Sequence, residues 1–330
     1  MGPKGYQKGE IMATIGVIIP NYNGKKYLTD CLKSLQKQNR TDLEVILVDN
    51  GSEDGSVALV KRDFPKVKIV ELSENTGFAN AVNVGIRESR SDYVFLLNND
   101  TICDDGAIDA LSEVLDKKPG VFSVQAKMLQ VKEPHLVDDA GDFYCALGWA
   151  FARGKDKDGD KFVRRTSITS ACAGAAMYRK AVFDEIGLFD EAHFCYLEDV
   201  DIGYRARLYG YENVIEPKAV VYHVGSASSG SRHNAFKVEL TAANNLYFIY
   251  KNLNAVQVII NLPLLILGVI IKHAFYMKKG LGKAHVRGLS KGFSKIIKNR
   301  DKKVSFKGRQ ILYSVVMQLE LWINLIRRLA

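Results

Sequence analysis

The chain has 330 residues, of which 47% are hydrophobic, and it contains 46 Lys plus Arg, 37 Asp plus Glu and five Cys. This composition excludes a disordered tail, a collagen-like repeat and a disulfide-stapled mini-domain, and the length allows one large α/β core or two modest domains. The cysteines form no CxxC pair, which predicts a reduced protein that faces the cytoplasm.

The basic excess is confined to the C-terminal end. Residues 251–330 hold 16 Lys plus Arg against two acids, a net charge of +14, and the remainder of the chain holds 30 against 35. A net-acidic body argues against nucleic acid as a partner, and a cationic, apolar end indicates an anionic membrane surface. Residues 1–13 contain no signal-peptide core and are interpreted as a leader or an expression remnant.

Four short apolar runs occur in the first hundred residues, at 14–19, 43–48, 67–72 and 93–97. Each is too short for a helix, is continuously apolar and ends in turn-forming residues, which is typical of buried parallel strands. Helical spacing of apolar residues separates the runs. The alternation predicts an α/β fold with a doubly wound, mostly parallel sheet, in which ligands bind at the carboxyl ends of the strands.

The loops after these runs are all polar and contain Asn or Asp, at 20–23, 49–52, 74–77 and 98–100. Each loop alone fits ordinary turn and capping chemistry, but four at one sheet edge predict a ligand site. No GxGxxG follows the first strand and the sequence has no P-loop, so dinucleotide-dependent oxidoreduction and P-loop phosphoryl transfer lack sequence support. A diphosphate bound here would require a divalent cation.

A candidate metal site follows the fourth run. If the chain stays extended, Asn98 and Asp100 point to the same side and offer an amide and a carboxylate oxygen, which suit Mg²⁺ or Mn²⁺. His223 ends a later β-branched run; such a residue is more often structural, but its imidazole could complete the metal shell. Arg232, in the Gly/Ser-rich segment that follows, could reach a phosphate oxygen.

A second cluster places Glu198, Asp199 and Asp201 within four residues, after the apolar stretch 194–197. These carboxylates repel one another unless cations or helix N-terminal amides compensate. One interpretation is a helix start with an acidic first turn. The functional alternative is a catalytic pair, Glu198 and Asp199, in which Asp199 is the base that takes a proton from a hydroxyl nucleophile.

Six motifs resemble glycosyltransferase family 2, especially its rhamnosyltransferase and galactofuranosyltransferase branch: VIIPNYNG, LVDNGSEDGS, ENTGFANAVNVG, LLNND, GLFDEAHFCYLEDVDIGYRARLYGY and VVYHVGSAS. The resemblance covers about residues 14–250. It implies a GT-A fold, a nucleotide-diphosphate sugar donor, Mg²⁺ or Mn²⁺, and inversion at the anomeric carbon. It favours dTDP-rhamnose, with UDP-galactofuranose or a UDP-hexose as alternatives, and sugar selection would depend on the pocket around residues 138–178.

The resemblance also implies roles for individual residues. The segments that hold the nucleoside are matched by Pro20, Asn21, Tyr22, Asp49, Asn50 and Ser52, and the segment beside the donor by Asn75, Gly77 and Asn83. Asn98, Asn99 and Asp100 match the DXD-like metal site, Asp199 the base of the ED motif, and His223 the histidine that can join the metal shell. Asn98 replaces an acid, which keeps an oxygen ligand but loses a charge.

These roles describe one displacement without an enzyme nucleophile. Asp100 would hold the cation that stabilises the leaving diphosphate, and Asp199 would deprotonate a hydroxyl of a lipid-linked or cell-surface glycan acceptor. Two alternatives stay open. One is a nucleotidyltransferase, although no basic triphosphate-binding loop follows the first strand, and the other is a catalytically inactive membrane-bound scaffold of the same fold.

The C-terminal region, 251–330, is interpreted as a helical membrane-association region. Residues 255–271 are almost wholly apolar but number only 17, whereas a spanning helix needs about 20, so a re-entrant or interfacial hairpin and a spanning helix both stay open. The cationic segment 278–309 and the apolar pattern 311–329 predict peripheral or monotopic anchoring on the cytoplasmic face of the membrane. The alternatives are a buried extension and a homo-oligomer formed through these helices.

Overall fold

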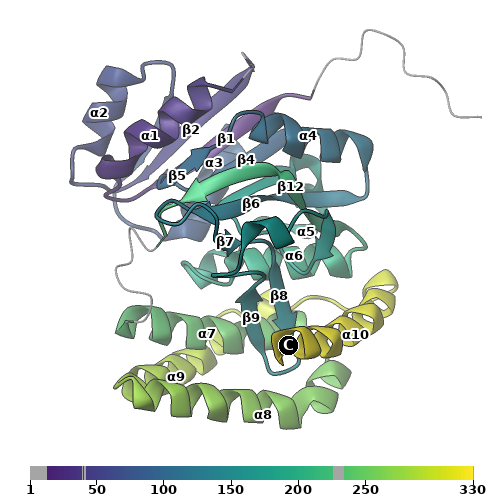
Figure 1. Ribbon diagram of the computed structural model, residues 1–330. Helices are drawn as coiled ribbons and strands as arrows, with labels where there is room; N and C mark the ends of the chain where they lie inside the picture. The colour runs from purple at the N-terminus through teal and green to yellow at the C-terminus, as the bar shows by residue number, and fades with distance from the viewer. Residues whose placement is uncertain (1–12, 39, 41, 226–233, 330) are drawn as a thin grey trace, which may run out of the picture.

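The structure is a computed structural model that describes residues 13–38, 40, 42–225 and 234–329. Within these residues, ten strands form one mixed sheet with helices on both faces (Figure 1). A layer of four helices from the C-terminal part of the chain lies below this α/β unit in the same view. Arg232 and most of the predicted leader lie outside the described residues.

The N-terminal half of the sheet is parallel, as predicted. Its strands are β1 (Ile15–Asn21), β2 (Leu43–Asn50), β3 (Lys68–Leu72) and β4 (Tyr93–Leu97), in the order β4-β1-β2-β3. The connecting helices are α1 (Lys25–Gln36), α2 (Ser56–Asp63) and α3 (Phe78–Glu88). β4 is buried at every position, which explains why its sequence is continuously apolar.

The second half of the sheet mixes strand directions. β11 (Ala175–Arg179) runs antiparallel to both β4 and β6 (Val121–Gln130), and β12 (Glu212–His223) runs parallel to β6. The shorter strands β5 (Thr101–Cys103), β7 (Val137–Asp139) and β10 (Thr166–Ile168) pair with this half. A separate hairpin consists of β8 (Asp142–Cys145) and β9 (Trp149–Ala152).

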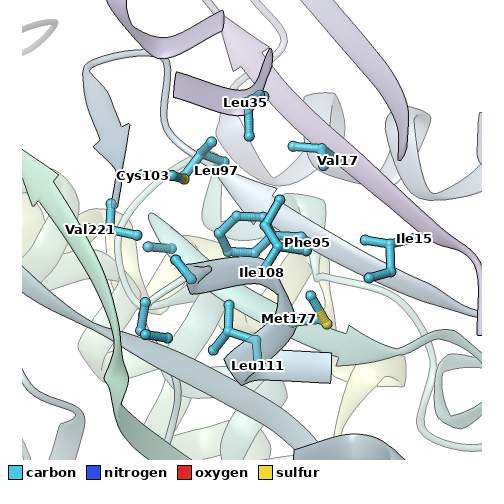
Figure 2. Close-up of a cluster of buried hydrophobic side chains, with 14 of the residues drawn as sticks. Ile15, Val17, Leu35, Phe95, Leu97, Cys103, Ile108, Leu111, Met177 and Val221 are labelled. Atoms are coloured by element: carbon cyan, nitrogen blue, oxygen red, sulfur yellow. The ribbon is translucent and has the colours of Figure 1, made fainter. Parts of the chain in front are cut away.

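Apolar clusters on both faces hold the sheet in place. Figure 2 shows one of them, in which Phe95 of β4 lies beside Ile108 and Leu111 of α4 (Ala107–Lys117), all fully buried. The cluster on the opposite face includes residues of α3 and of α6 (Glu198–Leu208), with the short helix α5 (Phe183–Ile186). Burial of large side chains contributes about 1.5–3 kcal/mol each, so the strand ends that carry the polar loops are rigidly placed.

The C-terminal helices are α7 (Ala235–Asn252), α8 (Ala255–Lys278), α9 (Gly282–Lys298) and α10 (Arg309–Leu329). α9 lies closely against α7, because Gly288 approaches the Glu239 carbonyl so nearly that an added Cβ would lie 2.4 Å from it. The hairpin interpretation of residues 255–271 is wrong, because α8 is one continuous helix. A capping box of Asn254 and Gln257 starts this helix.

Candidate active site

A cavity of about 1020 Å³ opens at the carboxyl ends of β1, β2 and β4. Its wall carries the acids from both sequence clusters, although these acids lie about a hundred residues apart in the chain. Twelve predicted site residues line it: Pro20, Asn21, Tyr22, Asn50, Asn75, Gly77, Asn98, Asn99, Asp100, Glu198, Asp199 and His223. The strand topology therefore brings the two clusters to one opening, as the general rule for such sheets requires.

The first two loops are joined by the amide of Asn21. Its Nδ2 donates to Asp49 Oδ1 at 2.7 Å and to Ser56 Oγ at 2.9 Å, and its Oδ1 accepts from Asn99 Nδ2 at 2.7 Å. Asp49 in turn accepts from the Ser52 backbone N–H at 2.9 Å. Asp49 and Ser52 do not line the cavity; instead they hold the loop that presents Asn21 and Asn50 to it.

The third loop is fixed by Asn50 in the same way. Asn50 Nδ2 donates to Asn75 Oδ1 at 3.0 Å and to the Gly77 carbonyl at 3.1 Å. Gly77 has φ +90°, and a Cβ at this position would lie 2.5 Å from the Phe194 ring. Glycine is therefore required both by the backbone conformation and by the close approach of the loop before α6.

The structure does not place Asn83 in this cavity. Its Nδ2 donates to the Phe189 carbonyl at 2.8 Å, its Oδ1 accepts from the Phe189 N–H at 3.0 Å, and the side chain is 1% exposed. Both polar atoms are thus used to hold the segment that precedes α6. The prediction that Asn83 lies beside the donor is wrong for this geometry, because α3 points the side chain toward that segment.

The loop after β4 turns instead of staying extended, so the predicted extended backbone at 98–100 is wrong, although Asn98 and Asp100 both line the cavity. Asn99 and Asp100 form a turn, because the next residue, Thr101, begins β5 and pairs with the end of β12. The turn sends the Asn99 amide to Asn21 and the Asp100 carboxylate toward β12.

The pairing of β5 with β12 brings His223 to Asp100. His223 Nε2 lies 3.3 Å from Asp100 Oδ1, and Nδ1 lies 2.8 Å from Asp138 Oδ2. Burial alone would lower the pKa of His223, but its hydrogen bonds with Asp100 and Asp138 raise that pKa to about 9. A carboxylate and an imidazole side by side, with the imidazole oriented by a second carboxylate, form a donor set that fits a small divalent cation.

The segment before α6 has an unusual backbone. Phe194, Tyr196 and Leu197 all have φ between 63° and 69°, a backbone conformation that residues other than glycine rarely adopt. Asn244 of α7 compensates, since its Nδ2 lies within 2.7–2.9 Å of the carbonyl oxygens of His193, Cys195 and Tyr196. Strain of this kind persists where neighbouring contacts fix it, and here it aims the first turn of α6 into the cavity.

Asp199 is held at this turn by backbone groups. Its Oδ1 accepts from the Val200 N–H at 2.8 Å, and its own carbonyl accepts from the Ser170 hydroxyl. Burial raises the pKa of the Asp199 carboxyl above its ordinary value, while the hydrogen bonds from the Val200 and Ala173 backbones act in the opposite direction. A raised pKa moves a carboxylate toward the range in which a general base works well near neutral pH.

Asp199 belongs to a group of four acids that form no ion pair with a cationic side chain in the described part of the chain. Burial raises the pKa of Glu198 and of Asp142, and repulsion between the acids raises both further. Burial also raises the pKa of Asp139 to about 6, although hydrogen bonds from Gln125 and the Gly141 backbone oppose the shift. Three of these acids line the cavity, namely Asp142, Glu198 and Asp199, and we refer to them as the cavity acids.

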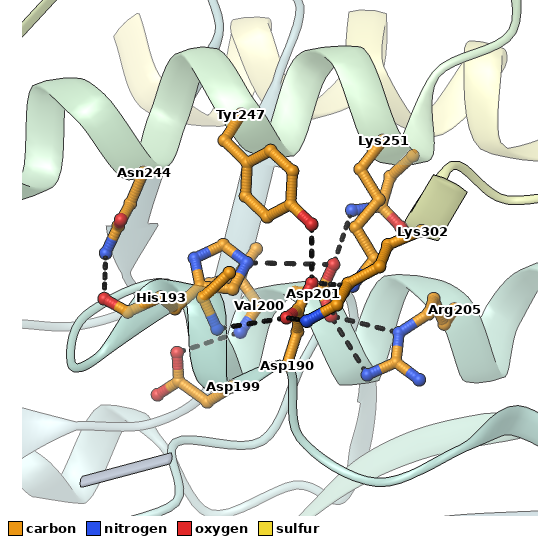
Figure 3. A network of polar contacts seen from close by, with 12 residues as sticks. Asp190, His193, Asp199, Val200, Asp201, Arg205, Asn244, Tyr247, Lys251 and Lys302 are labelled. Atoms are coloured by element: carbon orange, nitrogen blue, oxygen red, sulfur yellow. Dashed lines mark hydrogen bonds and ion pairs between the residues drawn. The ribbon is translucent and has the colours of Figure 1, made fainter. Parts of the chain in front are cut away.

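Two residues further along α6, Asp201 has opposite surroundings (Figure 3). Its carboxylate accepts from Lys251 Nζ at 2.9 Å, from Arg205 Nε at 3.0 Å and from Asn252 Nδ2 at 2.7 Å. Asp190 joins the network through Lys251 and Tyr247, both at 2.7 Å. Although Asp201 is buried, the charges of Lys251 and Arg205 hold its pKa well below the ordinary value.

Several cavity residues were not identified from the sequence, namely Asp142, Phe151, Cys172, Phe194, Tyr196 and Lys237. Asp138, which orients His223, was also missed. The segment VDDAGD at 137–142 contains three acids in six residues and was the available signal. It fell inside the region 138–178 assigned to the sugar pocket, but without the pairing of β7 and the β8–β9 hairpin no single acid could be selected.

Comparison with known proteins agrees with this arrangement. Residues 16–187, more than half of the chain, match the family described as Glycosyl transferase family 2. The chain is 26% identical over 239 residues to an N-acetylglucosaminyl-diphospho-decaprenol L-rhamnosyltransferase of Mycobacterium tuberculosis; the match covers 65% of this chain and 77% of that protein.

Two solved structures share the fold. GalNAc-T7, crystallised with UDP, GalNAc and Mn²⁺, superposes with a TM-score of 0.60 at 14% identity. The superposition covers 73% of this chain and 48% of the GalNAc-T7 chain. S. aureus TarS 1–349 in complex with UDP-GlcNAc has a TM-score of 0.58 at 18% identity, with 93% and 89% covered. The chain therefore belongs to glycosyltransferase family 2 and has the GT-A fold.

Proposed function

We propose that the protein is a metal-dependent, inverting glycosyltransferase that moves a sugar from a nucleotide-diphosphate donor to a hydroxyl of a lipid-linked or cell-surface glycan. The observation that supports this most directly is that Asp100 and Asp199 line the same cavity. Asp100 lies beside an imidazole that suits a metal, and Asp199 forms no ion pair with any cationic residue that the structure describes. A single displacement needs these two groups, one to hold a metal at the leaving diphosphate and one to deprotonate the attacking hydroxyl.

The donor end of the cavity is formed by the polar loops of β1 to β4. Asn21 and Asn50 are immobilised by their hydrogen bonds, so the wall that would receive the nucleoside is already formed. A divalent cation, Mg²⁺ or Mn²⁺, held by Asp100 and His223 would neutralise charge that develops on the leaving diphosphate. Asp138 keeps the His223 ring oriented.

At the other end, Asp199 takes the proton from the acceptor hydroxyl as that oxygen attacks the anomeric carbon. The hydrogen bond from Val200 fixes the carboxylate, and burial raises its pKa, which favours acceptance of a proton. The acceptor oxygen approaches from the face opposite the diphosphate, so one displacement gives one inversion.

Rhamnose is the favoured sugar. The supporting observation is the similarity to a mycobacterial protein named as an L-rhamnosyltransferase that acts on N-acetylglucosaminyl-diphospho-decaprenol. We therefore place dTDP-rhamnose first among the donors, before UDP-galactofuranose and UDP-hexoses, and a lipid-linked glycan first among the acceptors.

Product analysis with a panel of sugar nucleotides and Mn²⁺ tests the proposal. We expect nucleoside diphosphate to be released fastest from dTDP-rhamnose. Release of pyrophosphate would instead identify a nucleotidyltransferase. Absence of both products with every donor, in the presence of membranes that supply acceptors, would identify an inactive scaffold.

We further propose that residues 14–250 form the catalytic unit and that residues 251–330 bind an anionic membrane surface at the cytoplasmic face. Among the described residues, α8 is the one helix that is long and apolar enough to cross a bilayer, judged by length and composition alone. One side of α8 is used inside the protein, where Asn261 bonds with Gln318 and Trp322 of α10.

The other side of α8 exposes large apolar side chains, including Ile259, Ile266 and Ile270. Because one side packs against the protein, these observations favour a helix that lies in the plane of the interface. Washing membranes with high salt and then with detergent tests this. We expect release only by detergent, whereas release by salt alone would contradict the proposal.

A further inference from the structure

We infer that Asp142, with Glu198, forms a hydroxyl-binding subsite that holds the acceptor sugar beside Asp199. The inference rests on the proposed function, which it extends from the base to the groups that position its substrate. Asp142 begins β8 and lines the cavity together with Glu198 and Asp199.

The first observation is that two of these acids lack the partners that buried acids normally have. Glu198 is 5% exposed, and its Oε2 has no hydrogen-bond partner among the described residues although it lines the cavity. Asp142 is half-buried, and within the described part of the chain the charged groups that act on it are the acids Asp139, Asp199 and Glu198. Buried polar atoms without partners are rare, and the Glu198 oxygen belongs to a residue that lines a space which a ligand can enter.

The second observation is that Asp139 differs from its neighbours in being satisfied within the protein. It accepts from Gln125 Nε2 at 2.8 Å and from the Gly141 N–H at 2.7 Å, and it does not line the cavity. Asp139 therefore holds the turn before β8, while Asp142 and Glu198 present free acceptor oxygens. A carboxylate is a strong hydrogen-bond acceptor and makes charge-assisted bonds with hydroxyl donors.

The position of these acids indicates the acceptor sugar rather than the donor. The diphosphate end of the donor is proposed to lie at Asp100 and His223, and the acceptor must approach from the opposite face to reach Asp199. The β8–β9 hairpin that supplies Asp142 also supplies Phe151 to the cavity wall. An aromatic ring beside carboxylates offers one surface for the apolar face of a sugar and another for its hydroxyl groups.

The test compares the wild-type protein with Asp142→Asn, using Asp160→Asn as a control. Asp160 is exposed and lies outside the cavity, so its replacement removes the same charge without touching the subsite. Nucleoside diphosphate release is measured with Mn²⁺ and the best donor, first without acceptor and then with octyl glycosides of glucose, galactose, rhamnose and N-acetylglucosamine. The octyl glycoside that most accelerates release by the wild type is titrated against each variant.

We expect Asp142→Asn to raise the acceptor KM about 10- to 100-fold, because the variant loses a hydrogen bond to a charged group. The donor KM and the rate of donor hydrolysis without acceptor should stay within about two-fold of the wild type. Asp160→Asn should match the wild type throughout. An unchanged acceptor KM, or a rise confined to the donor KM, would overturn the inference while leaving the proposed function intact. Absence of diphosphate release by the wild type with every donor would remove the proposed function and this subsite together.

A competing occupant is a cation, because ligand atoms of Asp139, Asp142 and Cys172 lie within 4.8 Å of one another. Calorimetric titration of the EDTA-treated protein with Mn²⁺ alone distinguishes the two. A stoichiometry that is the same for the wild type and Asp142→Asn supports the hydroxyl subsite. A binding event that is lost in Asp142→Asn would overturn it in favour of a metal at these acids.

Discussion

Helix α6 separates two groups of acids that differ in their surroundings. Asp201 and Asp190 are bonded to Lys251, Arg205 and Lys302, whereas the cavity acids form no ion pair with any residue of the described ranges 13–38, 40, 42–225 and 234–329. The first group has lowered pKa values and the second has raised ones, although Asp199 and Asp201 are two residues apart. Compensated charge holds the helix in place, and uncompensated charge is reserved for a substrate.

The sharpest way to break this comparison is Asp199→Asn. The amide cannot accept the hydroxyl proton, so kcat should fall by about 10²–10⁴-fold, the contribution of a general base. Because the change removes a repelling charge and not a stabilising one, the folded state should not lose stability. The measurement is initial-rate release of nucleoside diphosphate, together with thermal shift on adding donor and Mn²⁺. Turnover close to that of the wild type would reject Asp199 as the base.

On the compensated side, Lys251→Met should act on stability first. The side chain is 3% exposed and is bonded to both Asp190 and Asp201, so its removal leaves two buried acids with less positive charge. Breaking a buried ion pair on one side costs about 3–5 kcal/mol of unfolding free energy, which urea denaturation measures. Lys283→Met on the exposed side of α9 is the control and should change stability by less than about 0.5 kcal/mol. Equal stability of the two variants would show that the network contributes little.

A third test asks whether Asp138 belongs with the functional acids. It contacts His223 Nδ1 and also pairs with Lys155, so it is compensated and yet touches the proposed metal residue. Groups that orient a metal ligand typically contribute 10- to 100-fold in affinity. Asp138→Asn should therefore weaken Mn²⁺ binding by about that factor, measured by calorimetry in the presence of a nucleoside diphosphate. Affinity equal to that of Asp160→Asn would make Asp138 a purely structural residue.

The functional acids also differ in whether the sequence alone could identify them. The strand-end loops and the acids at 100 and 199 were identified because local patterns and motif resemblance mark them, and the topology of the sheet brings them to one cavity. Asp142 and Asp138 carry no such local signal. Their importance arises only when β7 pairs with β6 and the β8–β9 hairpin folds beside α6, and the contact of β8 with α6 joins residues far apart in the chain.

The errors have a similar origin. Asn83 has the residue type of a ligand-binding amide, but the direction of its side chain depends on how α3 packs against the segment before α6. The loop at 98–100 was expected to stay extended because β4 is extended, but the pairing of β5 with β12 forces a turn. Asp201 was grouped with Glu198 and Asp199 by spacing alone. The hydrogen bond from Lys251 of α7 to Asp201 distinguishes Asp201 from Glu198 and Asp199.

The smallest expected effect is a difference in how the two groups of acids change the free energy of unfolding with pH. The pKa of Asp142 is higher in the folded protein than the value of about 3.9 for an unfolded chain, so the folded state binds the proton more tightly. Its contribution to stability therefore increases as pH falls through the folded pKa. For Asp190 and Asp201 the folded pKa is lowered, so the stability they contribute is present above about pH 4 and is lost only below it.

It follows that Asp142→Asn should be more stable than the wild type at pH 7.5, by about 1.4 kcal/mol for each unit by which the pKa of Asp142 is raised, and that the difference should be much smaller at pH 4, because it is lost only as pH falls to the unfolded pKa of about 3.9. Urea denaturation at both pH values measures it in metal-free buffer. His193 and His285 have lowered pKa values and favour unfolding as pH falls, but they are the same in both proteins and cancel in the difference. If Asp142→Asn were less stable than the wild type at pH 7.5, Asp142 would be a compensated acid like Asp201, and the division of α6 into a structural and a functional side would fail at this residue.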